Sequence, residues 1–234
     1  MITVVIDKNN IEDNVVRIKE KSEINHLKNV LRGKVGAEVR LIDGEKEYFS
    51  KISDISKKEI KLEIYSENKE DNYSVERDIT AAISIIKSDN MDLIIQKLTE
   101  IGIKKIVPII TNRVVVKLKK KKERWGKISK EALKQCRGIK FVEIEEPKLL
   151  KEFDFENYNR IIVPYEKEKE NKIKNLEIKK DEKLLYFIGP EGGFEEEEIL
   201  FLKEKGAETF TLGKRILRAE TAAIVVGGIL SNEF

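Results

Sequence analysis

The sequence from residue 78 onwards alternates short apolar runs with amphipathic helical patterns, and this alternation constrains the fold more than any other feature. The apolar runs cover residues 79–86, 104–110, 160–165, 183–189 and 209–213, and the helical patterns cover residues 90–102, 124–136, 195–206 and 220–230. Strands that are apolar on both faces are typical of parallel sheets, whose neighbouring strands are joined by helical crossovers. We therefore predict an α/β fold here, with a mostly parallel sheet covered by helices.

The first 72 residues have a different pattern, in which polar and apolar residues alternate over short runs. The predicted strands cover residues 1–6, 15–18, 37–44, 47–55 and 59–66. Asp43 and Gly44 form a hairpin-type dipeptide, so we expect a small, mostly antiparallel sheet or barrel. One helix is predicted over residues 22–32, with Ser22 as its N-cap and Gly33 at its end.

The polar stretch 66–76 separates these two patterns and is the predicted linker. We expect one domain over residues 1–72 and a second over residues 73–234, because 234 residues that are 40% hydrophobic can form two modest cores. The sequence has neither a secretory signal pattern nor an apolar run of the roughly 18 residues that span a bilayer. We therefore expect a soluble, cytoplasmic protein with no membrane partner.

The chain has one cysteine, Cys136, and one histidine, His26. One of each excludes an internal disulfide and a structural zinc site built from these ligands, so no metal is expected. We interpret Cys136 as a partly buried, inert thiol, because the only histidine lies in the other predicted domain.

Basic residues are concentrated in residues 73–146, which contain 17 Lys and Arg against 10 Asp and Glu. A regional excess of positive charge is typical of a protein that binds a phosphate backbone. The run Lys119–Lys122 contributes to this excess, but it equally suits a solvated helix start.

A glycine-rich turn, Gly189-Pro190-Glu191-Gly192-Gly193, follows the predicted strand that ends near Ile188. It matches neither a P-loop nor the dinucleotide-binding fingerprint. A phosphate here would lie beside the run Glu195–Glu198, and a helix dipole contributes only about 0.3–1 kcal/mol against such repulsion. The turn therefore favours a neutral or cationic ligand whose flat ring can approach the backbone closely.

A second glycine turn follows the predicted strand that ends at Leu212-Gly213, and Glu220 near the next helix start is either a helix cap or a functional carboxylate. The helix after it, 221–230, has no polar face, so we expect burial on all sides, partly against another subunit. Two glycine turns at carboxyl ends of strands can meet at one crevice of an open α/β sheet, which is where ligands bind.

Three segments together resemble the SPOUT-class methyltransferases, and in particular the RsmE family, which methylates N3 of a uridine in small-subunit ribosomal RNA. They are KSDNMDLIIQKLTEIGIKKIVPIITNRVV, IGPEGGFEEEEI and LGKRILRAETAAI. The segment HLKNVLRGKVGAEVRLIDG resembles the family's N-terminal PUA-like module. The resemblance covers nearly the whole chain, in order and with matching spacing.

The resemblance implies a SPOUT-like α/β domain with a C-terminal trefoil knot, an exception to the rule against threaded chains. It also implies a PUA-like β-barrel, a homodimer, a ribosomal RNA substrate and S-adenosylmethionine bound in the knot. The implied cofactor-binding residues are Ile188, Gly189, Pro190, Glu191, Gly192 and Gly193 on one wall, and Leu212, Gly213, Ile216, Leu217 and Arg218 on the other. A sulfonium cation agrees with the ligand preference of the first turn.

Methylation of uracil N3 requires a group that removes the N3 proton and a group that stabilises negative charge on the carbonyl oxygens. Arg218 is our candidate for the charge, and Glu220 is our candidate for the proton, beside its reading as a cap. The predicted RNA contacts are Arg32 in the N-terminal module and Lys87, Lys97 and Arg113 in the second domain. We interpret His26 as a module-stabilising residue and Trp125 as a packing residue.

The sequence departs from the family pattern at two places. After Gln135-Cys136 the chain has Gly138 and Val142 where an arginine and a proline are common, with Arg137 displaced by one position. Asn112 stands where an acidic residue is common. Two alternative functions stay open: methylation of another RNA position, such as a ribose 2'-hydroxyl, and a non-catalytic RNA-binding role in ribosome assembly.

Overall fold

The computed structural model describes residues 1–30, 34–69, 74–116 and 118–232. These residues form two compact units, Met1–Ser74 with Leu133–Phe141, and Val75–Ala132 with Val142–Phe234. The predicted domain boundary between residues 72 and 73 lies outside the described residues.

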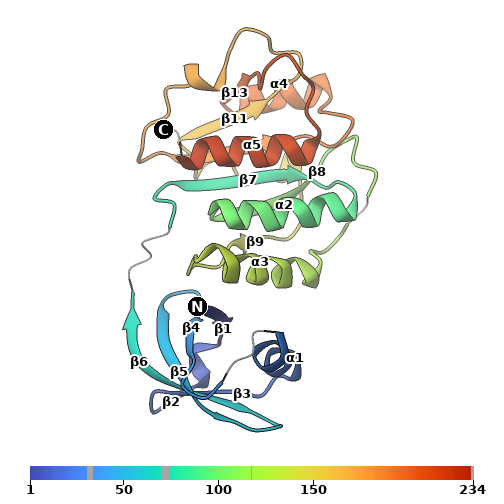
Figure 1. The fold of residues 1–234 in the computed structure, drawn as a ribbon. Coiled ribbons are helices and arrows are strands. Elements are labelled where there is room, and N and C mark those ends of the chain that lie inside the picture. The colour runs from blue at the N-terminus through green and yellow to red at the C-terminus, as the bar shows by residue number, and fades with distance from the viewer. Residues whose placement is uncertain (31–33, 70–73, 117, 233–234) are drawn as a thin grey trace. The chain divides into compact units, whose positions relative to one another are not determined.

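The first unit contains a six-stranded sheet in the order β1-β4-β5-β6-β3-β2 (Figure 1). Its strands are β1 (Ile2–Val5), β2 (Ile11–Glu12), β3 (Val15–Ile18), β4 (Glu38–Ile42), β5 (Glu47–Ile55) and β6 (Ile60–Asn68). Only the β1–β4 pair among these is parallel. Asp43 accepts hydrogen bonds from the backbone N–H groups of Glu45 and Lys46, at 2.8 and 2.7 Å, and Gly44 has φ +95°. The predicted, mostly antiparallel sheet with a turn at Asp43-Gly44 is thus confirmed.

The helical part of the first unit differs from the prediction. It comprises α1 (Lys21–Asn25) and a π-helical turn (His26–Val30), preceded by the short 3-10 helix η1 (Lys8–Asn10). The prediction of Ser22 as N-cap is wrong, because Glu20 is the extended residue before the helix and Ser22 lies in its first turn. The predicted end at Gly33 lies outside the described residues. The linker prediction is also wrong over residues 66–68, which pair with β5 as part of β6.

The second unit contains a sheet in the order β10-β8-β7-β12-β11-β13, with β9 beside β8. Its strands are β7 (Asp78–Ser84), β8 (Lys105–Ile110), β9 (Glu143–Ile144), β10 (Lys148–Leu149), β11 (Arg160–Pro164), β12 (Lys183–Ile188) and β13 (Ala207–Phe210). Every pair between these strands is parallel, which confirms the predicted sheet. The predicted strand 209–213 is wrong in its last residues, because the Thr211 hydroxyl accepts a hydrogen bond from the Gly213 N–H and turns the chain.

The helices of the second unit lie on both faces of this sheet. They are α2 (Ser88–Ile101), α3 (Glu123–Cys136), α4 (Glu196–Glu204) and α5 (Ala219–Asn232), with short 3-10 helices η3 (Leu150–Glu152) and η4 (Ile173–Asn175). The last residues of α3, from Leu133, belong to the first unit. α2 ends at Gly102, as predicted, with φ +91°. In Figure 1, α2 and α5 lie side by side along β7. Among the described residues, no helix is long and apolar enough to cross a membrane.

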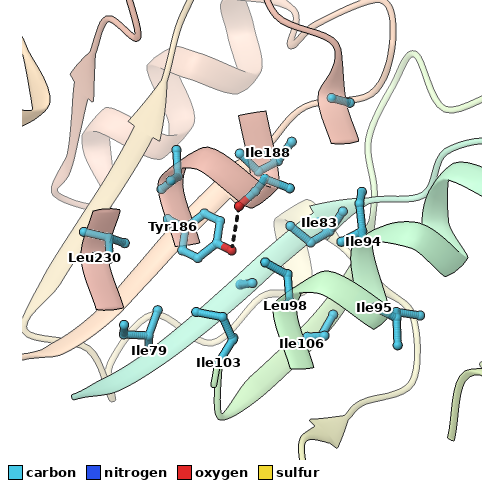
Figure 2. Close-up of a cluster of buried hydrophobic side chains, with 14 of the residues drawn as sticks. Ile79, Ile83, Ile94, Ile95, Leu98, Ile103, Ile106, Tyr186, Ile188 and Leu230 are labelled. Atoms are coloured by element: carbon cyan, nitrogen blue, oxygen red, sulfur yellow. Dashed lines mark hydrogen bonds between the residues drawn. The ribbon is translucent and has the colours of Figure 1, made fainter. Parts of the chain in front are cut away.

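Alternate residues of β12 fill two separate cores. Leu184, Tyr186 and Ile188 belong to the cluster that contains residues of α2 and α5. Leu185 and Phe187 belong to the cluster that contains residues of α4. The buried hydroxyl of Tyr186 donates a hydrogen bond to the carbonyl of Ala223 in α5, at 3.3 Å (Figure 2). The chain thus returns from the edge strand β13 to pack α5 over the centre of the sheet, while the trefoil knot stays a prediction.

The single chain buries one side of α5, and the predicted cover of the other side by another subunit stays a prediction. Ala223, Val226 and Leu230 are fully buried, whereas Val225 is 36% exposed. A helix packed on one sheet can bury only the side chains that face the sheet and the neighbouring helix. The apolar residues on the opposite side of α5 are therefore more exposed.

Candidate functional site

The carboxyl ends of the parallel strands lie at one edge of the sheet, and both predicted glycine turns lie there. The first turn follows β12 and the second follows β13. Because β11 lies between these strands, the two turns begin about 10 Å apart, at roughly 4.8 Å per strand. The segment 165–171, which follows β11, therefore lies between the turns in the order of the sheet.

The first turn has a backbone that leaves little room for side chains. Gly193 has φ +70°, and its N–H donates to the carbonyl of Pro190 at 2.9 Å. A Cβ atom on Gly193 would lie 3.2 Å from Oε1 of Glu166, and a Cβ on Gly189 would lie 3.1 Å from the ring of Phe194. Glycine is thus favoured at Gly193 by its left-handed conformation, and the Glu166 carboxylate lies close to the space that a side chain would take.

Two neighbouring strand ends contact this turn. The backbone N–H of Lys87, at the end of the β7 segment, donates to Oε1 of Glu191 at 3.2 Å. Nη1 of Arg113, beyond β8, donates to the carbonyl oxygen of Gly192 at 2.7 Å. Its Nε lies 3.6 Å from Oε1 of Glu195. The first turn is therefore held from the side of β7 and β8.

The glutamates at the start of α4 also bind protein groups. Glu198 is buried, and its carboxylate accepts hydrogen bonds from the N–H groups of Asn112 and Glu195, at 2.8 and 2.9 Å. Glu196 forms an ion pair with Lys167. The hydrogen bond and the charge of Lys167 hold the pKa of the Glu196 carboxyl below its ordinary value. These contacts fix the N-terminus of α4, where acidic groups also favour the helix dipole.

The segment 165–171 was not predicted as part of the site. Its Glu168 carboxylate accepts hydrogen bonds from the N–H groups of residues 169–171, at 3.1–3.2 Å, and from the hydroxyl of Thr209, at 3.1 Å. These bonds, the one from Asn171 first, hold the pKa of Glu168 below its ordinary value. The carbonyl of Asn171 accepts from the N–H of Thr211 at 2.7 Å. In the sequence, its position directly after a predicted buried strand is the feature that indicates a place in the site.

The second turn carries the predicted catalytic pair. Arg218 precedes α5, and its side chain is 87% exposed. The Glu220 side chain is only 11% exposed and lies in the first turn of α5, with Nη1 of Arg218 at 4.0 Å. Glu220 is the second residue of α5, so it is not the N-cap, although its charge still favours the helix dipole. Gly213 has φ +118°, and Ile216 is 87% exposed.

The predicted RNA contacts are not gathered at one place. Lys87 is exposed beside the first turn, and Arg113 reaches over it. Lys97 lies about 15 Å further along α2, at 1.5 Å per residue, and pairs with Glu100 at 2.9 Å. Arg32 lies outside the described residues. The structure therefore brings two of the four predicted contacts to the first glycine turn.

Other single residues have structural partners. Trp125 is buried, and its Nε1 donates to Asp92 at 3.2 Å, which places it in the packing of the second unit. Cys136 is half-buried, with Sγ 3.7 Å from the carbonyl of Leu133. Arg137 has φ +65°, and its carbonyl accepts a hydrogen bond from Arg40 at 2.8 Å. Within the described ranges, no group of three or more His, Cys, Asp or Glu side chains could hold a metal ion.

Two protein families match the chain in the order of its two units. Residues 14–65 match a family described as RNA methyltransferase PUA domain. Residues 74–231 match a family described as RNA methyltransferase domain. The second match contains both glycine turns and the segment between them.

Curated and solved relatives cover almost the whole chain. A protein of Aquifex aeolicus named ribosomal RNA small subunit methyltransferase E is 34% identical over 92% of this chain and 93% of its own. A protein of Borreliella burgdorferi named ribosomal RNA small subunit methyltransferase E 2 is 33% identical over 96% and 94%. The structure of a ribosomal RNA small subunit methyltransferase E from Neisseria gonorrhoeae, bound to S-adenosyl methionine, is similar with a TM-score of 0.86 and 27% identity, and the match covers 98% of this chain and 96% of that one.

Proposed function

The chain belongs to the ribosomal RNA small subunit methyltransferase E family of RNA methyltransferases, and from this membership we propose that it methylates N3 of a uridine in small-subunit ribosomal RNA, with S-adenosylmethionine as methyl donor. The observation that carries the proposal is the family match over both units together with intact glycine turns at one sheet edge. A cytoplasmic location follows from a ribosomal RNA substrate.

The residues of the first turn fit a cationic cofactor without phosphate. Arg113 and Lys167, two cations beside this turn, are engaged by Glu195 and Glu196, so they offer little free charge to an anion. The Glu166 carboxylate beside Gly193 adds a negative charge that suits a cation. We assign one wall of the pocket to Ile188, Gly189, Pro190, Glu191, Gly192 and Gly193, and the other to Leu212, Gly213, Ile216, Leu217 and Arg218. When bound, S-adenosylmethionine supplies an electrophilic methyl group on its sulfonium.

Glu220 and Arg218 take the two chemical roles in this proposal. The Glu220 carboxylate accepts the N3 proton, which leaves a lone pair on N3 for attack on the methyl carbon. Arg218 donates to the uracil carbonyl oxygens, where the negative charge spreads. Its 87% exposed side chain is free to reach a base, while the 11% exposed Glu220 is shielded from water. The target uridine must be unpaired or flipped out to reach this pair.

The remaining RNA contacts are proposed for the PUA-like unit, including Arg32, and for Lys87 and Lys97 in the second unit. The proposed assembly is a homodimer that covers the open side of α5. The exposed Val225, with the partly exposed Ile224 and Ile229, gives this side an apolar surface. Twofold dimers are the commonest soluble homo-oligomers. A sedimentation mass of twice 27.1 kDa is expected.

The decisive experiment incubates the protein with labelled S-adenosylmethionine and either naked ribosomal RNA or assembled small subunits, and then maps the modified nucleotide. The expected result is a methyl group on uridine N3. A methyl group on a ribose 2'-hydroxyl would show that the protein transfers methyl groups to a different RNA atom than proposed. Absence of label from both substrates would refute methyl transfer altogether, and calorimetry would then show whether the protein still binds the cofactor.

A further inference from the structure

We infer that Arg113 and Asn112 are positioning residues, which hold the cofactor-binding turn 189–193 in place from the end of β8. The inference rests on the proposed function of that turn as a wall of the donor pocket. It also replaces the RNA contact that the sequence predicts for Arg113. The two residues would thus act on the cofactor through the backbone and the α4 glutamates, without touching it.

Arg113 holds the turn in two ways. Its Nη1 donates to the carbonyl of Gly192 at 2.7 Å, and its Nε lies 3.6 Å from the Glu195 carboxylate. Its aliphatic stem lies over the same glycine, because a Cβ atom built on Gly192 would be 3.4 Å from Cδ and 3.6 Å from Cβ of Arg113. One side chain therefore both bonds and covers the middle of the turn.

Asn112 connects the same strand end to the helix that follows the turn. Its backbone N–H donates to the buried Glu198 carboxylate at 2.8 Å, and its side-chain amide donates to Glu195 at 2.7 Å. The turn is thus bounded by β12 on one side and by an anchored α4 on the other. A carboxylate at position 112 would lose the amide donor and would face the Glu195 carboxylate, so Asn112→Asp should release this anchor.

The charge of Arg113 is poorly suited to an RNA phosphate. Its side chain is 49% exposed, but the guanidinium is engaged by a carbonyl and by the Glu195 carboxylate. Glu191, whose carboxylate accepts from the Lys87 N–H, adds a further negative charge beside the same turn. Cations that bind nucleic acid contribute by neutralising phosphates, which requires a charge not already neutralised by protein carboxylates.

The first test compares two affinities of Arg113→Ala. Loss of hydrogen bonds that hold the turn should weaken S-adenosylmethionine binding about three- to ten-fold by calorimetry. The affinity for a ribosomal RNA fragment, measured by filter binding, should stay within about two-fold, with an unchanged salt dependence. Arg113→Lys should restore part of the cofactor affinity, because a lysine can still donate to the Gly192 carbonyl. Lys203→Ala, at an exposed lysine of α4, is the control for loss of one positive charge.

The opposite pattern would overturn the inference. An RNA-binding arginine would give weaker RNA binding and a salt slope smaller by about one, with the cofactor affinity unchanged. A second readout needs no cofactor. Amide hydrogen exchange of Glu191, Gly192 and Gly193 should be faster in Arg113→Ala and Asn112→Asp than in the protein without a substitution. The strands β7 and β12 should exchange at the same rate in all three proteins. If exchange in the turn is no faster in the variants, Arg113 and Asn112 do not position it. If the protein without a substitution does not bind the cofactor, the proposed function is refuted instead.

Discussion

Among the glycines inside the described helices, Gly227 in α5 has the least room for a side chain. It is buried, and a Cβ atom built on it would lie 3.0 Å from Cδ2 of Leu98 and 3.1 Å from the hydroxyl of Tyr186. Both distances are shorter than the roughly 3.5–4.0 Å of optimal carbon contacts. We therefore expect Gly227→Ala to force α2 and α5 apart.

The magnitude combines two opposing effects. Alanine gains about 1 kcal/mol over glycine in a helix interior, whereas overpacking a filled core costs about 1–3 kcal/mol. Gly126 in α3 is the matched control, because a Cβ there meets nothing within 4 Å, so Gly126→Ala should show only the gain. The two variants should therefore differ by about 1–3 kcal/mol, or roughly 2–4 °C in Tm for each kcal/mol.

Thermal unfolding followed by the fluorescence of Trp125 measures this difference in the second unit, since it is the only tryptophan in the chain and is buried there. Adding Tyr186→Phe to Gly227→Ala removes the oxygen at 3.1 Å and should recover part of the loss, as a positive coupling in a double-mutant cycle. If Gly227→Ala proved as stable as Gly126→Ala, the close packing of α5 on α2 and β12 would be wrong.

Three further changes have defined outcomes. Glu220→Gln should slow methyl transfer without changing the Kd for S-adenosylmethionine; unchanged turnover would remove this residue as the base. Glu168 has a pKa held below 4.5, so its contribution to stability is complete above pH 4.5 and is lost as the pH falls through the folded-state pKa. Glu168→Gln should therefore flatten the fall of Tm below pH 4.5, and an unaltered pH profile would contradict this. Glu47→Ala leaves the buried Arg40 without its carboxylate and should cost about 3–5 kcal/mol in urea unfolding, whereas Glu45→Ala, at an exposed ion pair, should leave stability unchanged.

The parts of the fold that the sequence predicts are the long periodic elements. α2 and β7 carry enough apolar repeats to define both their type and their position, and Gly102 marks the end of α2. β9 and β10 have two residues each, too short to carry any alternation. The composition of α5 indicates burial but not its partner, so the exposed side of the helix could not be separated from the packed side.

The candidate site was predictable as two glycine turns but not as an arrangement. The sequence places both turns at carboxyl strand ends, yet strand order decides what lies between them. β11 separates β12 from β13, and its segment 165–171 reaches the first turn through Glu166 and the end of β13 through Glu168. Hydrogen bonds between distant segments, such as that of Arg113 to Gly192, leave no local pattern in a single sequence.

The run Glu195–Glu198 has a second role in the structure besides the charge that the sequence shows. In sequence, four glutamates beside a glycine turn argue that an anion is repelled. In the structure, three of them have partners: Glu195 with Asn112 and Arg113, Glu196 with Lys167, and Glu198 with the N–H groups of Asn112 and Glu195. Two cations beside the turn, Arg113 and Lys167, are therefore already engaged by carboxylates. The same contacts thus hold the turn in place and keep Arg113 from binding a phosphate. A change that breaks the contact between Arg113 and Glu195 should therefore both loosen the turn and raise its affinity for anions.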